Sequence, residues 1–430
     1  MEKFIDAKTF INWVEKQKRF TPKASLDKMN YYCSLFDHPE NKFSSIHVTG
    51  TNGKGSTVAS IKTILRKANL NIATFTSPYI TIFNERIQYN DSYISDVDLL
   101  KYANRLIEKY PIIESSEYEL PSFFEFITLL AFLYFSELEN LDLAIIEVGM
   151  GGRLDSTNVI NSDLAIITNV AYDHMNVLGD TLDKIAIEKL GIVKNNVPLI
   201  CGVKDKNLQH LIVNECNKLN SQVVFSCLTA FEIKKMDIYG SQILLNDSNL
   251  LLDINLAGEH QIENALITYH AIQKLNEIYH NKKRNFPISN VILYEGLKNV
   301  NWPGRIEIVS YDPLIIIDGA HNIDAIERVT KFINILSYSN KRAVVSISHD
   351  KEKDKMIKLL DQTFNEIIFT KYTYERSSQA NELYDLSSCE KKIITNNIDE
   401  AYDYVLNNPN EFTIYLGSLY LVCDIRKKYK

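Results

Sequence analysis

Residues 46–65 constrain the fold of this chain more than any other stretch. A short run of apolar and β-branched residues, 46–49, leads into a glycine-rich turn with a lysine, 50–55, and a helical pattern follows through 58–65. A strand, a glycine-rich loop and a helix in this order are typical of a loop that binds phosphate groups. Backbone N–H groups and the positive end of the helix would hold the phosphates, and Lys54 would neutralise their charge.

The spacing of this loop differs from that of a standard P-loop. The standard motif has about four residues between its first glycine and the Gly-Lys pair, whereas only Thr51 and Asn52 separate Gly50 from Gly53. An ordinary glycine-rich turn is the alternative interpretation, and the coincidence of strand, turn and helix disfavours it. On its own, the stretch predicts that the protein binds a nucleoside triphosphate.

Strand patterns alternate with helical patterns along most of the chain. Residues 71–75, 143–148, 164–170 and 197–201 are expected strands, and the alternation starts again after residue 300. Such alternation indicates a largely parallel sheet, which binds ligands at the carboxyl ends of its strands. We expect an α/β protein with a P-loop-containing, largely parallel sheet domain followed by a smaller Rossmann-like α/β domain. The strands expected in the second domain are 314–317, 343–347, 366–369, 392–395 and 412–416.

Two further segments organise the expected domains. Residues 221–257 are poor in helix signals and are expected to form a small β-rich insertion. Pro303 and Gly304 make a linker signal, so we place a domain boundary near residue 300. The expected domains are therefore 1–299 and 300–430.

Composition argues against several classes of protein. The net charge of −7 gives no bulk attraction to nucleic acid. The six cysteines are scattered without a Cys-x-x-Cys pair, which favours reduced thiols over a zinc site. The N-terminus does not resemble a signal peptide, and no apolar run approaches the ~20 residues of a membrane span. We expect a cytoplasmic protein that binds neither nucleic acid nor membrane.

Polar groups stand at the carboxyl ends of four expected strands. They are Lys54 with its loop, Ser77, Glu147, and Asp173 with His174. These ends meet at one edge of a parallel sheet, and a bound nucleoside triphosphate needs a divalent cation there. The pattern predicts a Mg²⁺ site made by Ser77, Glu147 and His174. For each of them a structural role, as a capping, turn or ion-paired group, is the alternative.

Together these motifs resemble the folylpolyglutamate synthase/dihydrofolate synthase family, a branch of the Mur ligases. The resemblance covers nearly the whole chain, and the order of the motifs makes the set specific although each motif is weak alone. The motifs are residues 47–56, 76–78 with 84–87, 123–126, 147–158, 173–174 with 178–182, 188–192, 258–261 with 264–265, 302–305, 318–322 and 417–420.

The resemblance implies an ATP-dependent acid–amino-acid ligase. It would add L-glutamate to tetrahydrofolate or folylpolyglutamate, and also to dihydropteroate to give dihydrofolate, through an acyl-phosphate intermediate. ATP and Mg²⁺, the latter at two sites, are the implied cofactors, and the implied partners are a folate or dihydropteroate, L-glutamate and ATP. A monomer is also implied, with residues 1–299 as the ATP-binding central domain holding the folate pocket and 300–430 as the glutamate ligase domain.

The resemblance also implies roles for individual residues. Lys189 is a surface lysine by its local sequence, but it falls where the family carries a carbamylated lysine, which would be catalytic together with Lys54, Glu147 and His174. The implied phosphate-holding residues are Gly53, Lys54, Gly55 and Ser56; the other ATP contacts are Asn264, Arg305 and Asp318; the Mg²⁺ ligands are Ser77, Glu147 and His174; the pterin pocket holds Ser122, Phe123, Phe124, Glu125, Leu154, Asp155 and Ser156; and His321 and Ser418 lie near the glutamate or the nucleotide.

Three alternative functions remain open at this point. The first is a sibling activity, such as that of a monofunctional dihydrofolate synthase. The second is a Mur-type ligase acting on another acid, although a nucleotide-linked substrate would require a further domain before the P-loop, where only ~45 residues precede it, below the usual domain size. The third is a P-loop regulator that binds nucleotide without ligase chemistry.

Overall fold

The structure is a computed structural model that describes residues 2–18, 25–282, 286 and 288–429. Contacts divide the chain into two compact units. The division expected at residue 300 stays a prediction, because the units group two segments before it with the C-terminal part. Unit 1 comprises Met1–Ala230, Asn246–Leu250 and Glu263–Asn299, and unit 2 comprises Phe231–Leu245, Leu251–Ile262 and Val300–Lys430.

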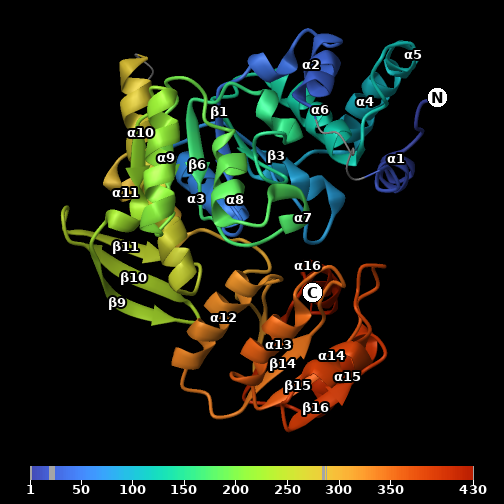
Figure 1. Cartoon of the computed structure of the whole chain (residues 1–430), viewed down its shortest axis with the longest axis vertical. Coiled ribbons are helices and arrows are strands. Elements are labelled where there is room, and N and C mark those ends of the chain that lie inside the picture. Colours follow the sequence, from blue (N-terminus) through green and yellow to red (C-terminus); the bar gives the residue numbers. More distant parts are fainter. Residues whose placement is uncertain (1, 19–24, 283–285, 287, 430) are drawn as a thin grey trace. The chain divides into compact units, whose positions relative to one another are not determined.

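Unit 1 is built on a mixed sheet that is mostly parallel (Figure 1). The strands β2, β5, β1, β6, β7 and β8 run parallel, and the β3–β4 hairpin adds an antiparallel edge. In the described part of the chain the order across this sheet is β4 (Ser92–Tyr93), β3 (Ile87–Tyr89), β2 (Ile72–Phe75), β5 (Leu143–Glu147), β1 (Ser45–Thr49), β6 (Leu164–Ile167), β7 (Leu199–Cys201) and β8 (Val223–Phe225).

Helices flank this sheet because its central strands are apolar on both faces. Phe75 and Ile146 point into one buried cluster, which also takes in the aromatic residues Phe10, Phe126 and Phe132 from helices. The helices before the strand of residues 231–237 are α1 (Ala7–Val14), α2 (Leu26–Ser34), η1 (Pro39–Asn41), α3 (Lys54–Lys67), η2 (Phe83–Arg86), α4 (Asp96–Ile107), α5 (Tyr110–Glu114), α6 (Phe123–Ser136), η3 (Ser156–Val159), α7 (Met175–Leu178), α8 (Leu182–Leu190), α9 (Lys206–Lys218) and η4 (Ser226–Leu228).

The expected β-rich insertion at 221–257 contains a small antiparallel sheet and one strand of the large sheet. Its first strand, β8, pairs in parallel with β7. The other three form a separate sheet in the order β11 (Leu250–Ile254), β10 (Gly240–Leu245) and β9 (Phe231–Asp237). The long helix α10 (Glu259–Asn281) follows and leads on to α11 (Asn290–Lys298).

Unit 2 contains a second α/β layer, so the predicted fold class is confirmed. Its sheet is parallel except for β12, which pairs antiparallel with β13. Within the described residues the strand order is β12 (Glu307–Tyr311), β13 (Leu314–Ile317), β17 (Phe412–Leu416), β14 (Lys341–Val345), β15 (Glu366–Phe369) and β16 (Lys391–Ile394). The helices are α12 (Ile323–Ile335), α13 (Lys353–Asp361), α14 (Ala380–Leu386), α15 (Ile398–Asn407) and α16 (Leu419–Lys428).

Candidate active site

The glycine-rich loop lies between β1 and α3, as the sequence predicted. Gly53 adopts a left-handed conformation, with φ of +84°, and directly precedes α3. A Cβ on Gly53 would lie 2.4 Å from Asn264 Oδ1, so α10 packs closely on the loop. Lys54 folds back over the loop and donates from Nζ to the Gly50 carbonyl oxygen at 3.0 Å. The loop therefore has the backbone and the cation of a phosphate site.

Two residues that the sequence reasoning missed hold this loop in shape. Asn169 Oδ1 accepts hydrogen bonds from the backbone N–H groups of Thr51 (3.1 Å) and Asn52 (2.8 Å). The Thr168 hydroxyl donates to the Asn52 carbonyl oxygen at 2.6 Å. Residues 164–170 were expected to form one strand, but β6 ends at Ile167, which frees both side chains to meet the loop.

Lys189 is almost completely buried, with 2% of its surface exposed. The local prediction of a surface lysine is therefore wrong. Burial lowers the pKa of Lys189 to about 7, the positive charge of Lys54 acts in the same direction, and Asp173 opposes both. A substantial fraction of Lys189 is thus a neutral, nucleophilic amine near neutral pH. Lys189 follows the buried Ile185 by one helical turn of α8, and this spacing is the signal that could have placed it inside.

Ser77 and Glu147 meet at the ends of two neighbouring strands. β2 pairs in parallel with β5, and the backbone N–H of Ser77 donates to Glu147 Oε2 at 2.9 Å. Glu147 is 4% exposed, although it is a carboxylate at the end of an apolar strand. Its oxygen chemistry fits a hard cation such as Mg²⁺.

His174 follows β6, which lies two strands beyond β5 in the same sheet. It adopts a left-handed conformation (φ of +50°) at the start of α7, and its backbone N–H donates to Asp173 Oδ1 at 2.9 Å. Its ring Nε2 lies 3.9 Å from the same oxygen. Within the described ranges no three His, Cys, Asp or Glu side chains gather into a metal-binding cluster. The ligand set of Ser77, Glu147 and His174 stays a prediction.

The residues 122–125 form the start of α6. Ser122 is its N-cap, and the Ser122 backbone N–H donates to Glu125 Oε2 at 2.7 Å. Glu125 also pairs with Lys28 at 3.1 Å, and both side chains are buried. The Phe124 ring lies against Gly149, where a Cβ would come within 2.5 Å of Phe124 Cζ. The Phe124 ring at this helix start therefore borders the loop that follows Glu147.

Asp155 points inward and organises this loop. Its Oδ2 accepts from the Met150 backbone N–H at 2.9 Å, and its Oδ1 accepts from the Thr157 hydroxyl at 2.6 Å. Thr157 Oγ1 in turn lies 2.8 Å from His47 Nε2 on β1. Burial raises the pKa of Asp155 and lowers that of His47 to about 3. Leu154, by contrast, is 40% exposed.

In unit 2, Asp318 fixes the backbone that carries Arg305. Asp318 follows β13 and is buried, with Oδ2 accepting from the Ile306 N–H (2.9 Å) and Oδ1 from the Ala320 N–H (2.8 Å). Burial raises the pKa of Asp318, while the charge of Arg305 lowers it. Arg305 Nη1 donates to the Gly304 carbonyl oxygen at 2.9 Å.

His321 and Ser418 follow the neighbouring strands β13 and β17. The His321 Nδ1 lies 2.8 Å from the Gly319 carbonyl oxygen, which can only accept, so Nδ1 carries the proton. Ser418 is the N-cap of α16, and its hydroxyl accepts from the Tyr420 N–H at 3.2 Å. Asp318, His321 and Ser418 thus follow the carboxyl ends of strands of unit 2, whereas Arg305 precedes β12.

Comparison with known proteins gives matches over both units. The description "Mur ligase middle domain" matches residues 48–272, and "Mur ligase, glutamate ligase domain" matches residues 304–418. The Bacillus subtilis dihydrofolate synthase/folylpolyglutamate synthase is 35% identical over 97% of this chain and 98% of its own length. The chain belongs to the Mur ligase family. The resemblance found in the sequence is confirmed.

Two further relatives agree with this assignment. The Lacticaseibacillus casei folylpolyglutamate synthase is 31% identical to this Mur ligase over 91% of each chain. The crystal structure of folylpolyglutamate synthase from Thermotoga maritima superposes with a TM-score of 0.84 at 27% identity, covering 98% of this chain and 96% of that one. This Mur ligase is therefore an ATP-dependent ligase, as the sequence predicted.

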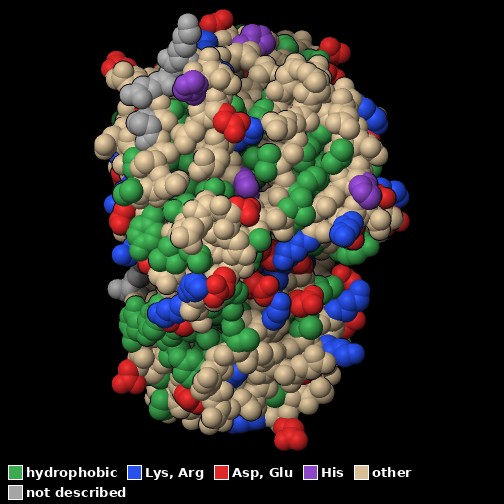
Figure 2. Space-filling view, turned by 90° about the vertical axis from the view of Figure 1, so that its left-hand side faces the viewer, with side chains coloured by type: hydrophobic (Ala, Val, Ile, Leu, Met, Phe, Trp, Pro, Cys, Tyr) green, Lys and Arg blue, Asp and Glu red, His purple; other side chains and the backbone are tan. Residues whose placement is uncertain are grey.

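Surface and helix properties complete the description of the chain. On the face shown in Figure 2, basic and acidic side chains lie intermixed. Among the helices of the described ranges, none combines the length and the apolar character needed to cross a bilayer.

The left-handed Gly53 gives a first testable prediction. In Gly53→Ala the backbone of residue 53 would keep a φ that is unfavourable for alanine, and the new methyl group would displace Asn264 Oδ1. We therefore expect ATP affinity to fall about tenfold and the free energy of unfolding to fall by about 1–2 kcal/mol. Calorimetric ATP titration and urea unfolding measure the two effects. Adding Asn264→Ala should relieve the contact but not the backbone cost. Wild-type ATP affinity in Gly53→Ala would contradict the phosphate-loop assignment.

Proposed function

We propose that this Mur ligase adds L-glutamate to tetrahydrofolate and folylpolyglutamate, and also to dihydropteroate, which gives dihydrofolate. The observation that carries the proposal is the nearly full-length match to a Bacillus subtilis relative whose name includes both activities. The Lacticaseibacillus casei relative is named for folylpolyglutamate synthesis alone, so a single activity is the narrower alternative. We also propose that the enzyme is a cytoplasmic monomer, which sedimentation and cell fractionation test.

The reaction requires ATP because a carboxylate does not react with an amine at neutral pH. An oxygen of the acid attacks the γ-phosphorus, and the bond to the β,γ-bridging oxygen breaks. ADP departs, and the acid has become an acyl phosphate. The amino group of glutamate then attacks the acyl carbon. The tetrahedral intermediate collapses, phosphate leaves with the bonding electron pair, and the new amide loses a proton. The protein has to position groups and neutralise charge rather than form a covalent bond itself.

The loop of unit 1 supplies that neutralisation. Gly53, Gly55 and Ser56 stand at the start of α3, where N–H groups and the helix dipole favour phosphate. Lys54 already lies across this loop, and its ammonium would exchange the Gly50 carbonyl for a phosphate oxygen. Asn264, packed on Gly53, is placed to contact the nucleotide from α10.

Mg²⁺ would be held by Ser77, Glu147 and His174. The first two already share a hydrogen bond through the Ser77 backbone, and their oxygen atoms suit this ion. When bound, Mg²⁺ offsets negative charge on the phosphates during transfer. We further propose a second Mg²⁺ site at Lys189.

Lys189 would serve that second site as a carbamate. The neutral amine attacks the carbon of CO₂, a C–N bond forms, and one proton is released, so that a neutral amine becomes an anionic carbamate. The buried position and the pKa near 7 support this proposal, because the amine is deprotonated more easily near neutral pH than a lysine with the ordinary pKa of 10.5. An anion at this position would also be stabilised by the nearby charge of Lys54.

Unit 2 would contribute contacts to the nucleotide and glutamate. Asp318 holds the backbone N–H of Ile306, the residue after Arg305, so we expect Arg305 to present its guanidinium to ATP. His321 and Ser418 stand at adjacent strand ends, and we assign them to the incoming glutamate or the nucleotide.

The pterin pocket would divide its residues between contact and positioning. Phe123, Phe124 and the exposed Leu154 offer apolar surface for a flat ring. Buried Asp155 and Glu125 instead bind backbone N–H groups, so they would position the pocket. Ser122 and Ser156 cap or begin the helical segments of the same pocket.

The proposal predicts glutamate-dependent ADP release with two acids. Purified enzyme is incubated with ATP and Mg²⁺ and either dihydropteroate or tetrahydrofolate, with and without L-glutamate. We expect ADP release to require both the acid and glutamate, and mass spectrometry to find one added glutamyl residue for each ADP. Lys54→Ala should abolish both signals, because the phosphate loop loses its cation.

Each other outcome points to a different function. Product from one acid only would establish a single activity. ADP release that is slow and independent of glutamate would support a nucleotide-binding regulator. Inactivity with both acids, in protein that still binds ATP, would support a Mur-type ligase for another acid.

A further inference from the structure

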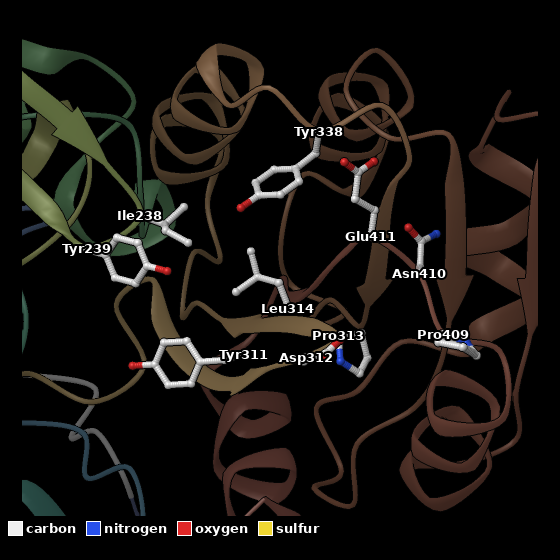
Figure 3. Close-up of a pocket in the computed structure, with 10 residues that line it drawn as sticks. All are labelled: Ile238, Tyr239, Tyr311, Asp312, Pro313, Leu314, Tyr338, Pro409, Asn410 and Glu411. Atoms are coloured by element: carbon white, nitrogen blue, oxygen red, sulfur yellow. The ribbon is translucent and has the colours of Figure 1, made fainter.

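A cavity in unit 2 is lined by ten residues, none of which is assigned to the ligase reaction (Figure 3). It has a volume of about 450 Å³, within the range of small-molecule sites. One of its lining residues, Leu314, is the first residue of β13, whereas Asp318 follows the other end of that strand. Glu411 likewise precedes β17, whereas Ser418 follows it. Within unit 2, the cavity is therefore at the opposite edge of the sheet from Asp318 and Ser418.

The apolar part of this cavity is rich in aromatic surface. Figure 3 shows Leu314 among the rings of three tyrosines. Tyr239 and Tyr311 are largely exposed, at 59% and 71%, and Tyr338 packs on the core residue Phe412 with ring centroids 5.2 Å apart. Exposed tyrosine rings that line one cavity are typical of sites for flat or cationic ligands.

The charged part of the cavity is acidic. Asp312 and Glu411 line it, and among the lining residues that the structure describes there is no lysine or arginine. Glu411 is held in place because its Oε2 accepts from the backbone N–H groups of Ser339 (2.9 Å) and Asn340 (3.1 Å). Burial raises the pKa of Tyr338, and the charges of Tyr239 and Glu411 act in the same direction.

One nearby cation is already engaged elsewhere. The ammonium of Lys341 interacts electrostatically with Glu411, but it is buried and donates to the Ile333 carbonyl oxygen at 2.9 Å. A cationic ligand would complement the carboxylates of Asp312 and Glu411 inside the cavity.

We propose that this cavity, which we call the tyrosine cavity, is a second ligand site for a small organic cation with a flat apolar body. The body would lie over Leu314 and Pro313 between the tyrosine rings. Its ammonium, amidinium or guanidinium group would face Asp312 and Glu411, where cation–π contact and opposite charge act together. The proposal does not rest on the folate reaction.

The test uses benzamidinium as the probe with full-length enzyme, observed by ligand NMR and titration calorimetry. Benzamide has nearly the same shape without the charge, and benzoate has the opposite charge. We expect saturable benzamidinium binding with a Kd below about 1 mM, and weaker binding of both controls. Equal binding of benzamide or benzoate, or no saturation by benzamidinium, would overturn the proposal.

Variants locate the probe within the tyrosine cavity. We expect Tyr239→Leu and Asp312→Asn to raise the Kd about 5–10-fold, because each removes one attraction to the cation. Tyr239→Phe keeps the ring and should keep the affinity, which separates ring contact from folding damage. The matched exposed changes Tyr93→Leu and Asp247→Asn should leave the Kd unchanged.

The same variants separate this site from the ligase. Tyr239→Leu and Asp312→Asn should retain wild-type turnover of ATP and acid, since neither residue belongs to the proposed active site. An unchanged benzamidinium Kd in both variants, with circular dichroism like that of the wild type, would place the probe elsewhere and refute the site.

Discussion

Lys189→Ala is expected to lower kcat for glutamate ligation about 1000-fold, the scale seen when one preorganised charged group is removed from an active site. Short carboxylates such as formate or acetate should restore part of this activity, because they supply an anion in the space left by the side chain. Lys184→Ala is the matched control, since Lys184 lies on the same helix, α8, but is exposed and paired with Asp180. Full activity of Lys189→Ala would refute the assignment.

The carbamate has a signature that is independent of turnover. Wild-type enzyme in ¹³C-bicarbonate should show a carbamate carbon resonance that is absent from Lys189→Met. Because the pKa of Lys189 is about 7, the resonance and the activity should weaken together as pH falls below 7 and the amine is protonated. Removing bicarbonate should lower activity, and adding it should restore activity. A wild-type spectrum without the resonance at pH 8 would exclude the carbamate.

Burial of Lys189 also predicts how stability depends on pH. The folded pKa of about 7 lies below the unfolded value of 10.5, so between these values the unfolded state binds more protons. In bicarbonate-free solution this lysine makes a contribution to stability that is complete above pH 10.5 and is lost as pH falls to 7. The difference in unfolding free energy between wild type and Lys189→Met should therefore change across this window.

Glu147→Gln is expected to have the second largest effect, a loss of about 100–1000-fold in kcat together with a higher Mg²⁺ requirement. Glutamine keeps the size of the side chain, and its amide oxygen can still accept from the Ser77 N–H. The variant therefore removes charge while leaving the local hydrogen bond possible. Activity is measured over a Mg²⁺ titration at saturating ATP.

Two controls make the Glu147 result specific. Glu139→Gln changes an exposed carboxylate near the start of the same strand, β5, and should leave the Mg²⁺ titration unchanged. Urea unfolding should show that Glu147→Gln is folded. Wild-type turnover of Glu147→Gln at low Mg²⁺ would count decisively against Glu147 as a ligand.

The fold could be predicted closely because buried strands leave a strong local signal. The strands at 314–317, 366–369 and 412–416 were placed at their observed bounds, since continuous apolar runs mark strands buried on both faces. The strand expected at 164–170 was too long because Thr168 and Asn169 continue the sequence pattern of a strand. Their side chains serve the phosphate loop instead, a contact between segments far apart in sequence.

The candidate site divides in the same way between local and long-range information. The sequence placed Ser77, Glu147 and the loop at strand ends, and the parallel sheet brings those ends to one edge. It did not show that Asp155 and Glu125 turn inward to bind backbone groups, because such contacts depend on how loops pack. The tyrosine cavity joins residues from 238 to 411 and left no sequence motif.

The amino-acid sequence by itself determined the order of strands and helices, the phosphate loop and the family of this protein. These follow from local periodicity, from turn chemistry and from the order of short motifs. Only the tertiary structure decided that Lys189 is buried with a lowered pKa. Its spacing from Ile185 is compatible with an inward position but does not fix one, whereas burial and the charges of Lys54 and Asp173, which are distant in sequence, set the pKa of its amine.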